Sequence, residues 1–161
     1  MGARVARGRW RGIGRQQRWQ ADPVGTRRGL DRSARMRLLR GSVVVVELDP
    51  TVGHEQQGVR PCVVVSDPDV IGDQRFPLVC VVPITGSEGE GLLYPELAPG
   101  RSGLAKKSFA LIDHLRSIDK RRVRRAFGVL GREELAAIDQ GLEAYLGLAG
   151  QHPAADSASV E

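Results

Sequence analysis

The chain has 161 residues, a length that fits one domain with short extensions and excludes a protein of several large domains. Hydrophobic residues make up 41% and charged residues 27%, as in ordinary globular proteins, and no apolar run is long enough for a membrane helix. The formal net charge is +5, but residues 1–40 hold twelve arginines and two acids (net +10), whereas residues 41–161 hold twelve basic and seventeen acidic residues (net −5). Nucleic-acid binding therefore has to be argued from local groups in the second part.

The first 35 residues are rich in Arg, Gly and Gln and show no hydrophobic period, so we expect a disordered leader there. Met36 stands shortly before the first apolar run, and our hypothesis is that translation starts at Met36; the intact mass of the native protein tests it. We expect the folded domain over 36–150 and a disordered tail over 151–161. The Arg-rich start lacks the apolar segment of a secretory signal, so we expect a cytoplasmic protein.

From Ser42 onward, short β-branched runs alternate with turn residues, which is typical of a small all-β barrel or sandwich. The predicted strands are 43–48, 61–66, 77–85, 92–97, 108–112 and 126–130. After Gly131 the hydrophobic period changes to about 3.6 residues, which predicts an amphipathic helix ending near Gly147 or Gly150. The fold class is therefore mainly β with a C-terminal amphipathic helix. Cys62 and Cys80 lie inside predicted strands, so we expect buried free thiols.

Two polar segments carry groups suited to chemistry. GHEQQGVRP (53–61) follows the first predicted strand, and DHLRSIDKRR (113–122) follows the fifth. Taken alone, each also fits a solvated loop, but both close strands, so one mouth of a barrel could bring them together. No metal-ligand spacing, phosphate-binding glycine loop or nucleophile elbow is present in the sequence. Arginine, histidine, carboxylate and hydroxyl groups suit metal-free scission of RNA, in which the ribose 2′ oxygen attacks the adjacent phosphorus.

Five segments in order resemble the MazF/PemK (Kid) toxins of type II toxin–antitoxin systems: VVVVELDPTVGHEQQGVRPCVVVS, VVPITG, LLYPEL, DHLRSIDKRRV and the C-terminal helix. The resemblance spans about 40–148. It implies a small SH3-like barrel of the CcdB/MazF type and a homodimer that cleaves single-stranded RNA at short sequences. It also implies 2′,3′-cyclic phosphate and 5′-hydroxyl ends, no metal and no cofactor. The implied partners are a cognate MazE/PemI-like antitoxin that occupies the RNA groove, and operator DNA bound together with that antitoxin.

The resemblance also assigns catalytic residues. Arg60 matches the family arginine that acts on the scissile phosphate, and Thr85 matches the threonine that supports this phosphate through a hydrogen bond. Glu55 matches the glutamate of the Glu-Gln pair in the family's first loop. His54, the residue before it, matches the histidine that the Kid-like branch has there. Asp113 falls where that branch has a catalytic aspartate. We expect Arg60 and Thr85 to be the most important of these five residues.

A second group of residues is expected to bind RNA. It comprises Gln56, His114, Arg116, Lys120 and Arg121. Two positions depart from the family pattern. Leu111 stands where the Kid-like branch has an arginine thought to act as an acid, so this role is vacant or belongs to Arg60. His114 stands where many members have glutamine, and it either supplies acid–base chemistry or replaces the glutamine as a hydrogen-bonding group.

Two other functions stay open from the sequence. One is a non-enzymatic toxin like CcdB, which has the same fold and inhibits DNA gyrase through protein contacts. The other is a degenerate family member that binds only nucleic acid or antitoxin. Arg60 and Thr85 favour the ribonuclease, because a gyrase inhibitor does not need a phosphate-binding arginine in this loop. The loops over 67–76 and 86–101 are expected to set the RNA sequence that is cleaved.

Overall fold

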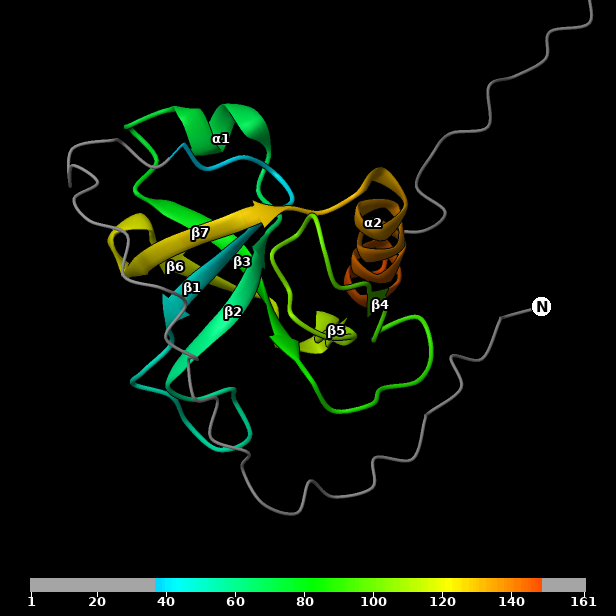
Figure 1. Ribbon diagram of the computed structural model, residues 1–161. Coiled ribbons are helices and arrows are strands. Elements are labelled where there is room, and N and C mark those ends of the chain that lie inside the picture. The colour runs from blue at the N-terminus through cyan, green and yellow to red at the C-terminus, as the bar shows by residue number, and fades with distance from the viewer. Residues whose placement is uncertain (1–36, 149–161) are drawn as a thin grey trace, which may run out of the picture. The chain divides into compact units, whose positions relative to one another are not determined.

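The structure is a computed structural model that describes residues 37–148 (Figure 1). The expected leader over 1–35 and tail over 151–161 lie outside the described residues. Eleven elements follow one another along the described part of the chain: β1 (Ser42–Glu47), β2 (Val59–Val64), α1 (Pro68–Gly72), β3 (Leu78–Thr85), β4 (Glu96–Leu97), β5 (Ser108–Ala110), η1 (Ile112–His114), β6 (Arg116–Asp119), η2 (Lys120–Arg122), β7 (Val123–Val129) and α2 (Arg132–Leu146). The two η elements are single turns of 3₁₀ helix. No helix within residues 37–148 is long and apolar enough to cross a membrane.

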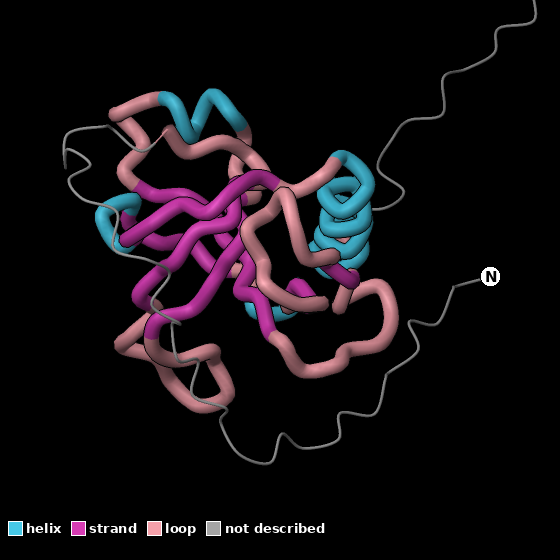
Figure 2. The backbone as a smooth tube through the Cα atoms, viewed as in Figure 1, coloured by secondary structure: helices cyan, strands magenta, loops and turns pink. Residues whose placement is uncertain are grey.

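The strands form one sheet in the order β4-β5-β3-β2-β1-β7, and every pairing is antiparallel. One edge of β3 is shared, because β6 pairs with its first half and β5 with its last two residues. The sheet therefore divides along β3 and curls into a half-barrel, with α2 packed at one side (Figures 1 and 2). This architecture confirms the predicted mainly-β fold with a closing helix.

The two faces of the curled sheet bury separate hydrophobic clusters, because successive side chains of a strand point to opposite faces. Val43 of β1 belongs to the cluster that also contains Ile138 of α2. Its neighbour Val44 belongs to the second cluster, together with Ile71 of α1 and Ile118 of β6. Runs such as VVVV are thus apolar at nearly every position because both faces of these strands are covered.

The terminal helix has defined ends. Glu134 accepts a hydrogen bond from the backbone N–H of Gly131 (2.8 Å), which satisfies one of the free donors at the start of α2. The helix ends at Gly147, whose φ of 70° is the left-handed conformation that glycine adopts readily. Gly141 is buried, and a Cβ atom there would lie 2.8 Å from the carbonyl oxygen of Leu92 and 2.9 Å from Cγ1 of Ile112. Glycine at this position therefore lets α2 lie close against the chain around η1.

Four details differ from the sequence expectations. Of the strand predicted at 92–97 only Glu96–Leu97 forms, and the loop over 67–76 contains the short helix α1. Strand β6 lies inside the second polar segment, where no strand was predicted, and β7 begins at Val123 rather than at residue 126. Strand β6 and the start of β7 were missed because their sequences are polar, and their pairing comes from distant segments and not from their own hydrophobic pattern.

Candidate functional site

The two polar segments meet, as the sequence analysis predicted. The loop between β1 and β2 and the chain from η1 into β6 border an open cavity of about 560 Å³. The cavity is lined by Val52, His54, Glu55, Gln56, Pro83, Asp113, His114, Leu115, Arg116 and Ser117. Six of the ten predicted site residues therefore line one cavity: His54, Glu55, Gln56, Asp113, His114 and Arg116. We call this space the η1 cavity.

The loop that carries His54 and Glu55 is fixed at its base. Asp49 accepts a hydrogen bond from the backbone N–H of Gly58 (3.0 Å), and Leu48 N–H donates to the carbonyl of the same glycine (2.9 Å). The guanidinium of Arg122 donates to the Asp49 carbonyl (2.6 Å) and so attaches the loop to η2. Because both ends of the loop are held, its polar side chains stay at the entrance of the η1 cavity.

Ionisable groups face one another in this cavity. Nη1 of Arg116 lies 3.6 Å from Oε2 of Glu55, and Nε2 of His114 lies 3.9 Å from Oδ1 of Asp113. Neither contact is a hydrogen bond. Within residues 37–148, Nη1 of Arg116 and Oδ1 of Asp113 are the two buried side-chain nitrogen or oxygen atoms without a hydrogen-bond partner. The cavity thus contains one donor and one acceptor without a protein partner, and water or a ligand has to pair with both.

Asp113 is held in place by two tyrosines that the sequence analysis did not single out. The hydroxyl of Tyr94 donates to Oδ2 of Asp113 (2.7 Å), and the hydroxyl of Tyr145, on α2, donates to the backbone carbonyl of Asp113 (3.3 Å). Tyr94 belongs to the quoted segment LLYPEL, so the sequence contained the residue but gave no sign of its contact, which joins positions 19 residues apart.

Arg60 and Thr85 lie next to this cavity rather than in its lining. The β2–β3 register pairs Cys62 with Pro83, and Arg60 and Thr85 each lie two residues beyond this pair on their strands. Side chains two residues apart on a strand share a face, so Arg60 and Thr85 lie on the face to which Pro83 contributes. Arg60 Nε donates to the Gln57 carbonyl (2.8 Å), which leaves the outer nitrogens of its guanidinium to other partners.

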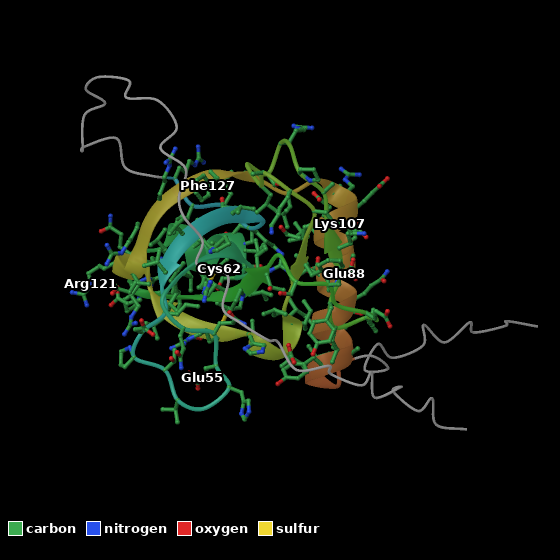
Figure 3. The ribbon with its side chains drawn as sticks, turned by 60° about the horizontal axis from the view of Figure 1, so that its bottom comes forward. Glu55, Cys62, Glu88, Lys107, Arg121 and Phe127 are labelled. Carbon is green, nitrogen blue, oxygen red and sulfur yellow. The ribbon has the colours of Figure 1, made fainter. Side chains whose placement is uncertain are left out.

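The remaining predicted RNA-binding residues lie elsewhere. The ammonium of Lys120 donates to the carbonyls of Val70, Ile71 and Asp73 at 2.9 to 3.1 Å, so its three N–H groups hold the α1 loop. Arg121 pairs with Asp119 (2.8 Å) in a second depression of about 490 Å³. Figure 3 shows Arg121 well apart from Glu55. Their role in RNA binding stays a prediction, and it would not be exerted from the η1 cavity.

The pKa values of two side chains, Asp119 and Cys62, are shifted from their ordinary values. Hydrogen bonds from Arg121 lower the pKa of Asp119 to about 2. Burial raises the pKa of the Cys62 thiol to about 12, partly offset by the charge of Arg116. Both cysteines are free, as expected, but only Cys62 is fully buried; Cys80 is half-buried, with its Sγ 3.3 Å from the Ser117 hydroxyl.

Two further observations concern the position where the Kid-like branch has an arginine, occupied here by Leu111, and the groups that could bind a metal ion. Leu111 is 4% exposed and belongs to the core, so no polar group projects from this position toward the cavity. Among the described residues, no group of three or more His, Cys, Asp or Glu side chains is placed to hold a metal ion.

The family model of the PemK-like, MazF-like toxins of type II toxin–antitoxin systems matches residues 39–146. The chain belongs to this family and is therefore the toxin of a type II toxin–antitoxin system.

Solved structures of MazF toxins resemble the chain in fold and in sequence. MazF from Deinococcus radiodurans is 30% identical, with a TM-score of 0.57, over 66% of this chain and 94% of that chain. MazF in a MazE–MazF structure from the same organism is 27% identical, with a TM-score of 0.56, over 70% and 98% of the two chains.

A third solved structure supports the fold alone. It is an endoribonuclease from a mycobacterial species in complex with its cognate antitoxin, 20% identical with a TM-score of 0.58, over 69% of this chain and 96% of that chain. The MazF-type barrel expected from the sequence is thereby confirmed.

Proposed function

We propose that this toxin is a sequence-specific, metal-independent endoribonuclease that cleaves single-stranded RNA and leaves 2′,3′-cyclic phosphate and 5′-hydroxyl ends. The observation that carries the proposal is the pair of unsatisfied atoms in the η1 cavity, Oδ1 of Asp113 and Nη1 of Arg116. Family membership and the endoribonuclease among the similar structures support it.

RNA supplies the two groups that the cavity lacks. A ribose hydroxyl can donate to the carboxylate oxygen of Asp113, and a phosphate oxygen can accept from the guanidinium of Arg116. The two groups are adjacent along an RNA strand, because the 2′ hydroxyl neighbours the 3′ phosphate. DNA offers the phosphate without the hydroxyl, so the same cavity would leave Asp113 unpaired with a DNA strand.

The reaction needs two proton transfers and stabilisation of a pentacovalent phosphorus. A base takes the proton of the 2′ hydroxyl, the 2′ oxygen bonds to phosphorus, the bond to the 5′ oxygen breaks, and an acid protonates that oxygen. We assign phosphate stabilisation to Arg60 and Thr85, since arginine stays charged and donates two hydrogen bonds at once. The groups available for the proton transfers are the carboxylates of Glu55 and Asp113 and the imidazoles at 54 and 114.

The proposed partners follow from the same site. An extended antitoxin segment with carboxylates would compete with RNA phosphate for Arg60 and Arg116, and the MazE–MazF structures of a similar protein support an antitoxin of the MazE/PemI type. We further propose that the toxin acts as a homodimer in the cytoplasm, and that toxin and antitoxin together bind operator DNA.

The deciding experiment is cleavage of a long single-stranded RNA by the full chain in excess EDTA, with chemical analysis of the product ends. We expect cyclic phosphate ends from the wild type and a loss of at least a hundredfold in rate with Arg60→Ala, because one preorganised donor to the transition state contributes roughly that factor. Arg132→Ala, on the exposed start of α2, is the matched control and should cleave normally. Intact RNA with a folded wild-type protein would reject the ribonuclease, and inhibition of gyrase would then support the CcdB-like alternative.

A further inference from the structure

Asp113 is contacted by tyrosine hydroxyls from the loop before β4 and from α2, and only one of them touches its carboxylate. Tyr94 donates to Oδ2 (2.7 Å), whereas Tyr145 donates to the backbone carbonyl (3.3 Å). The other carboxylate oxygen, Oδ1, is buried and has no hydrogen-bond partner, and Asp113 lines the η1 cavity. The contact with Tyr94 therefore decides which oxygen of Asp113 is left for a ligand.

Tyr94 is itself fixed by the backbone on both sides. The carbonyls of Leu93 and Pro95 accept hydrogen bonds from the backbone N–H groups of Ile112 (3.1 Å) and Ala110 (3.0 Å). The segment that carries Tyr94 is thus joined directly to the segment that leads into Asp113. These backbone hydrogen bonds hold the hydroxyl of Tyr94 within reach of the carboxylate of Asp113.

Gly89, in the preceding loop, packs against the same tyrosine. A Cβ atom at Gly89 would lie 2.7 Å from Cβ and 3.0 Å from Cγ of Tyr94, so the loop backbone packs on the base of the side chain. Tyr94 N–H also donates to the Gly91 carbonyl (3.0 Å), which completes a turn around it. The tyrosine is therefore wedged between its loop and the η1 segment.

The orientation of a carboxylate needs such support, because the terminal torsion of an aspartate side chain is soft. Without a donor at Oδ2, the carboxylate of Asp113 is free to turn relative to its ionisable neighbours. These are His114, with Nε2 3.9 Å from Oδ1, and the Arg116–Glu55 pair on the same cavity. A carboxylate turned in this way would no longer present Oδ1 to an RNA strand.

We propose that Tyr94 is a positioning residue for RNA cleavage: its hydroxyl holds the Asp113 carboxylate so that Oδ1 faces the ribose hydroxyl of the bound strand. This inference rests on the proposed ribonuclease function. Tyr94 does not line the cavity and acts through Asp113. Tyr145 supports the same residue through its backbone and fixes its place, not the direction of its carboxylate.

The test is steady-state cleavage of a short RNA by the full chain, comparing Tyr94→Phe with the matched control Tyr145→Phe. Each change removes one hydroxyl that contacts Asp113. Because a hydrogen bond to a charged group is lost, we expect Tyr94→Phe to lower kcat by roughly tenfold to a hundredfold with little change in KM. Tyr145→Phe should lower kcat clearly less, because its longer hydrogen bond ends on the backbone carbonyl and not on the carboxylate. In an Asp113→Asn background, Tyr94→Phe should lower kcat by less than about twofold, because residues that act through one another are not additive.

Equal losses of kcat in the two single variants, or a full additional loss in the Asp113→Asn background, would overturn the proposal. A wild type that folds but does not cleave RNA would instead defeat the proposed function. In that case, crystal structures of the wild type and Tyr94→Phe decide the positioning role independently of activity. An Asp113 carboxylate that keeps its orientation in the variant would refute it, and a rotated carboxylate would support it.

Discussion

The guanidinium of Arg116 and the carboxylate of Glu55 face each other at 3.6 Å across the η1 cavity without forming a hydrogen bond. Opposite charges at this distance attract, yet the donor of Arg116 stays available to a better acceptor. An anionic ligand that enters the cavity therefore competes with Glu55 for the same guanidinium.

This competition predicts opposite effects on RNA affinity from the two residues. Arg116→Ala should weaken binding of a 2′-O-methyl oligonucleotide, which cannot be cleaved, by roughly tenfold, because a charge-assisted contact to phosphate is lost. Glu55→Gln should strengthen binding severalfold, because it removes a like charge from the path of the phosphate. Fluorescence anisotropy over a range of salt concentrations measures both effects. The slope of log affinity against log salt should fall by about 0.7 in Arg116→Ala.

Arg121→Ala is the matched control for Arg116→Ala. Arg121 belongs to the same basic run of the sequence, but it pairs with Asp119 in the second depression. Because Arg121 lies outside the η1 cavity, we expect its removal to weaken binding less than the removal of Arg116 does. If the two arginine variants lost affinity equally, the η1 cavity would not be the principal RNA site.

Cys62 should be chemically inert in the folded protein. Its pKa of about 12, raised by burial, leaves roughly one molecule in ten thousand as the reactive thiolate at pH 8. A thiol reagent at pH 8 should therefore modify one cysteine per native chain, Cys80, and both cysteines in urea. Cys80→Ser should show no reaction until urea is added. Rapid modification of native Cys80→Ser would contradict the buried position of Cys62.

Asp119 should make stability depend on pH in a defined window. Hydrogen bonds from Arg121 lower its pKa from 3.8 to about 2 in the folded protein, so folding favours the ionised carboxylate. The stabilisation is present in full above about pH 4 and is lost as the pH falls through 2. The difference in free energy of unfolding between wild type and Asp119→Asn should be constant above pH 5 and shrink toward pH 2. Urea titrations at several pH values measure it, and a difference that grows on acidification would contradict the ion pair.

Gly128 should tolerate no side chain. A Cβ atom at this position of β7 would lie 2.3 Å from the carbonyl oxygen of Arg101 and 2.9 Å from the backbone carbon of Ser102. Gly128→Ala should therefore lower the free energy of unfolding by about 1–3 kcal/mol, or more if the loop cannot move. Gly72→Ala is the control, because nothing lies within 4 Å of its added Cβ and its φ is ordinary. Equal stability of the two variants would show that the loop does not press on β7.

The parts of the fold that the sequence predicted are those with their own hydrophobic pattern. Strands β1, β2 and β3 contain apolar runs over 43–46, 61–64 and 78–84, and α2 carries apolar residues at helical spacing between two glycines. Strand β6 reads RSID, and only Ile118 in it is buried. It forms because β3 offers it a free edge, from Val79 opposite Ile118 to Val81 opposite Arg116. Such pairing depends on distant residues and has no local signal.

The candidate site divides in the same way. The meeting of the His54 loop with the Asp113 segment was predictable, because both follow strands of one small barrel. Arg116, Lys120 and Arg121 were predicted as members of one RNA-binding group, but β6 and η2 direct them to different places. Tyr94 escaped notice because its role depends on a contact with Asp113 that only the folded chain creates.

Lys120 restricts the motion of the loop over 67–76, and we expect this loop to influence the RNA sequence that is cleaved. Three carbonyl oxygens of that loop, from Val70, Ile71 and Asp73, converge on its ammonium group. If the loop swung outward, the cation would lose all three partners at once, so the loop resists displacement as a unit. Sequence preference would then be set by a rigid template that selects among RNA conformations, and not by a flexible arm that adapts to each strand.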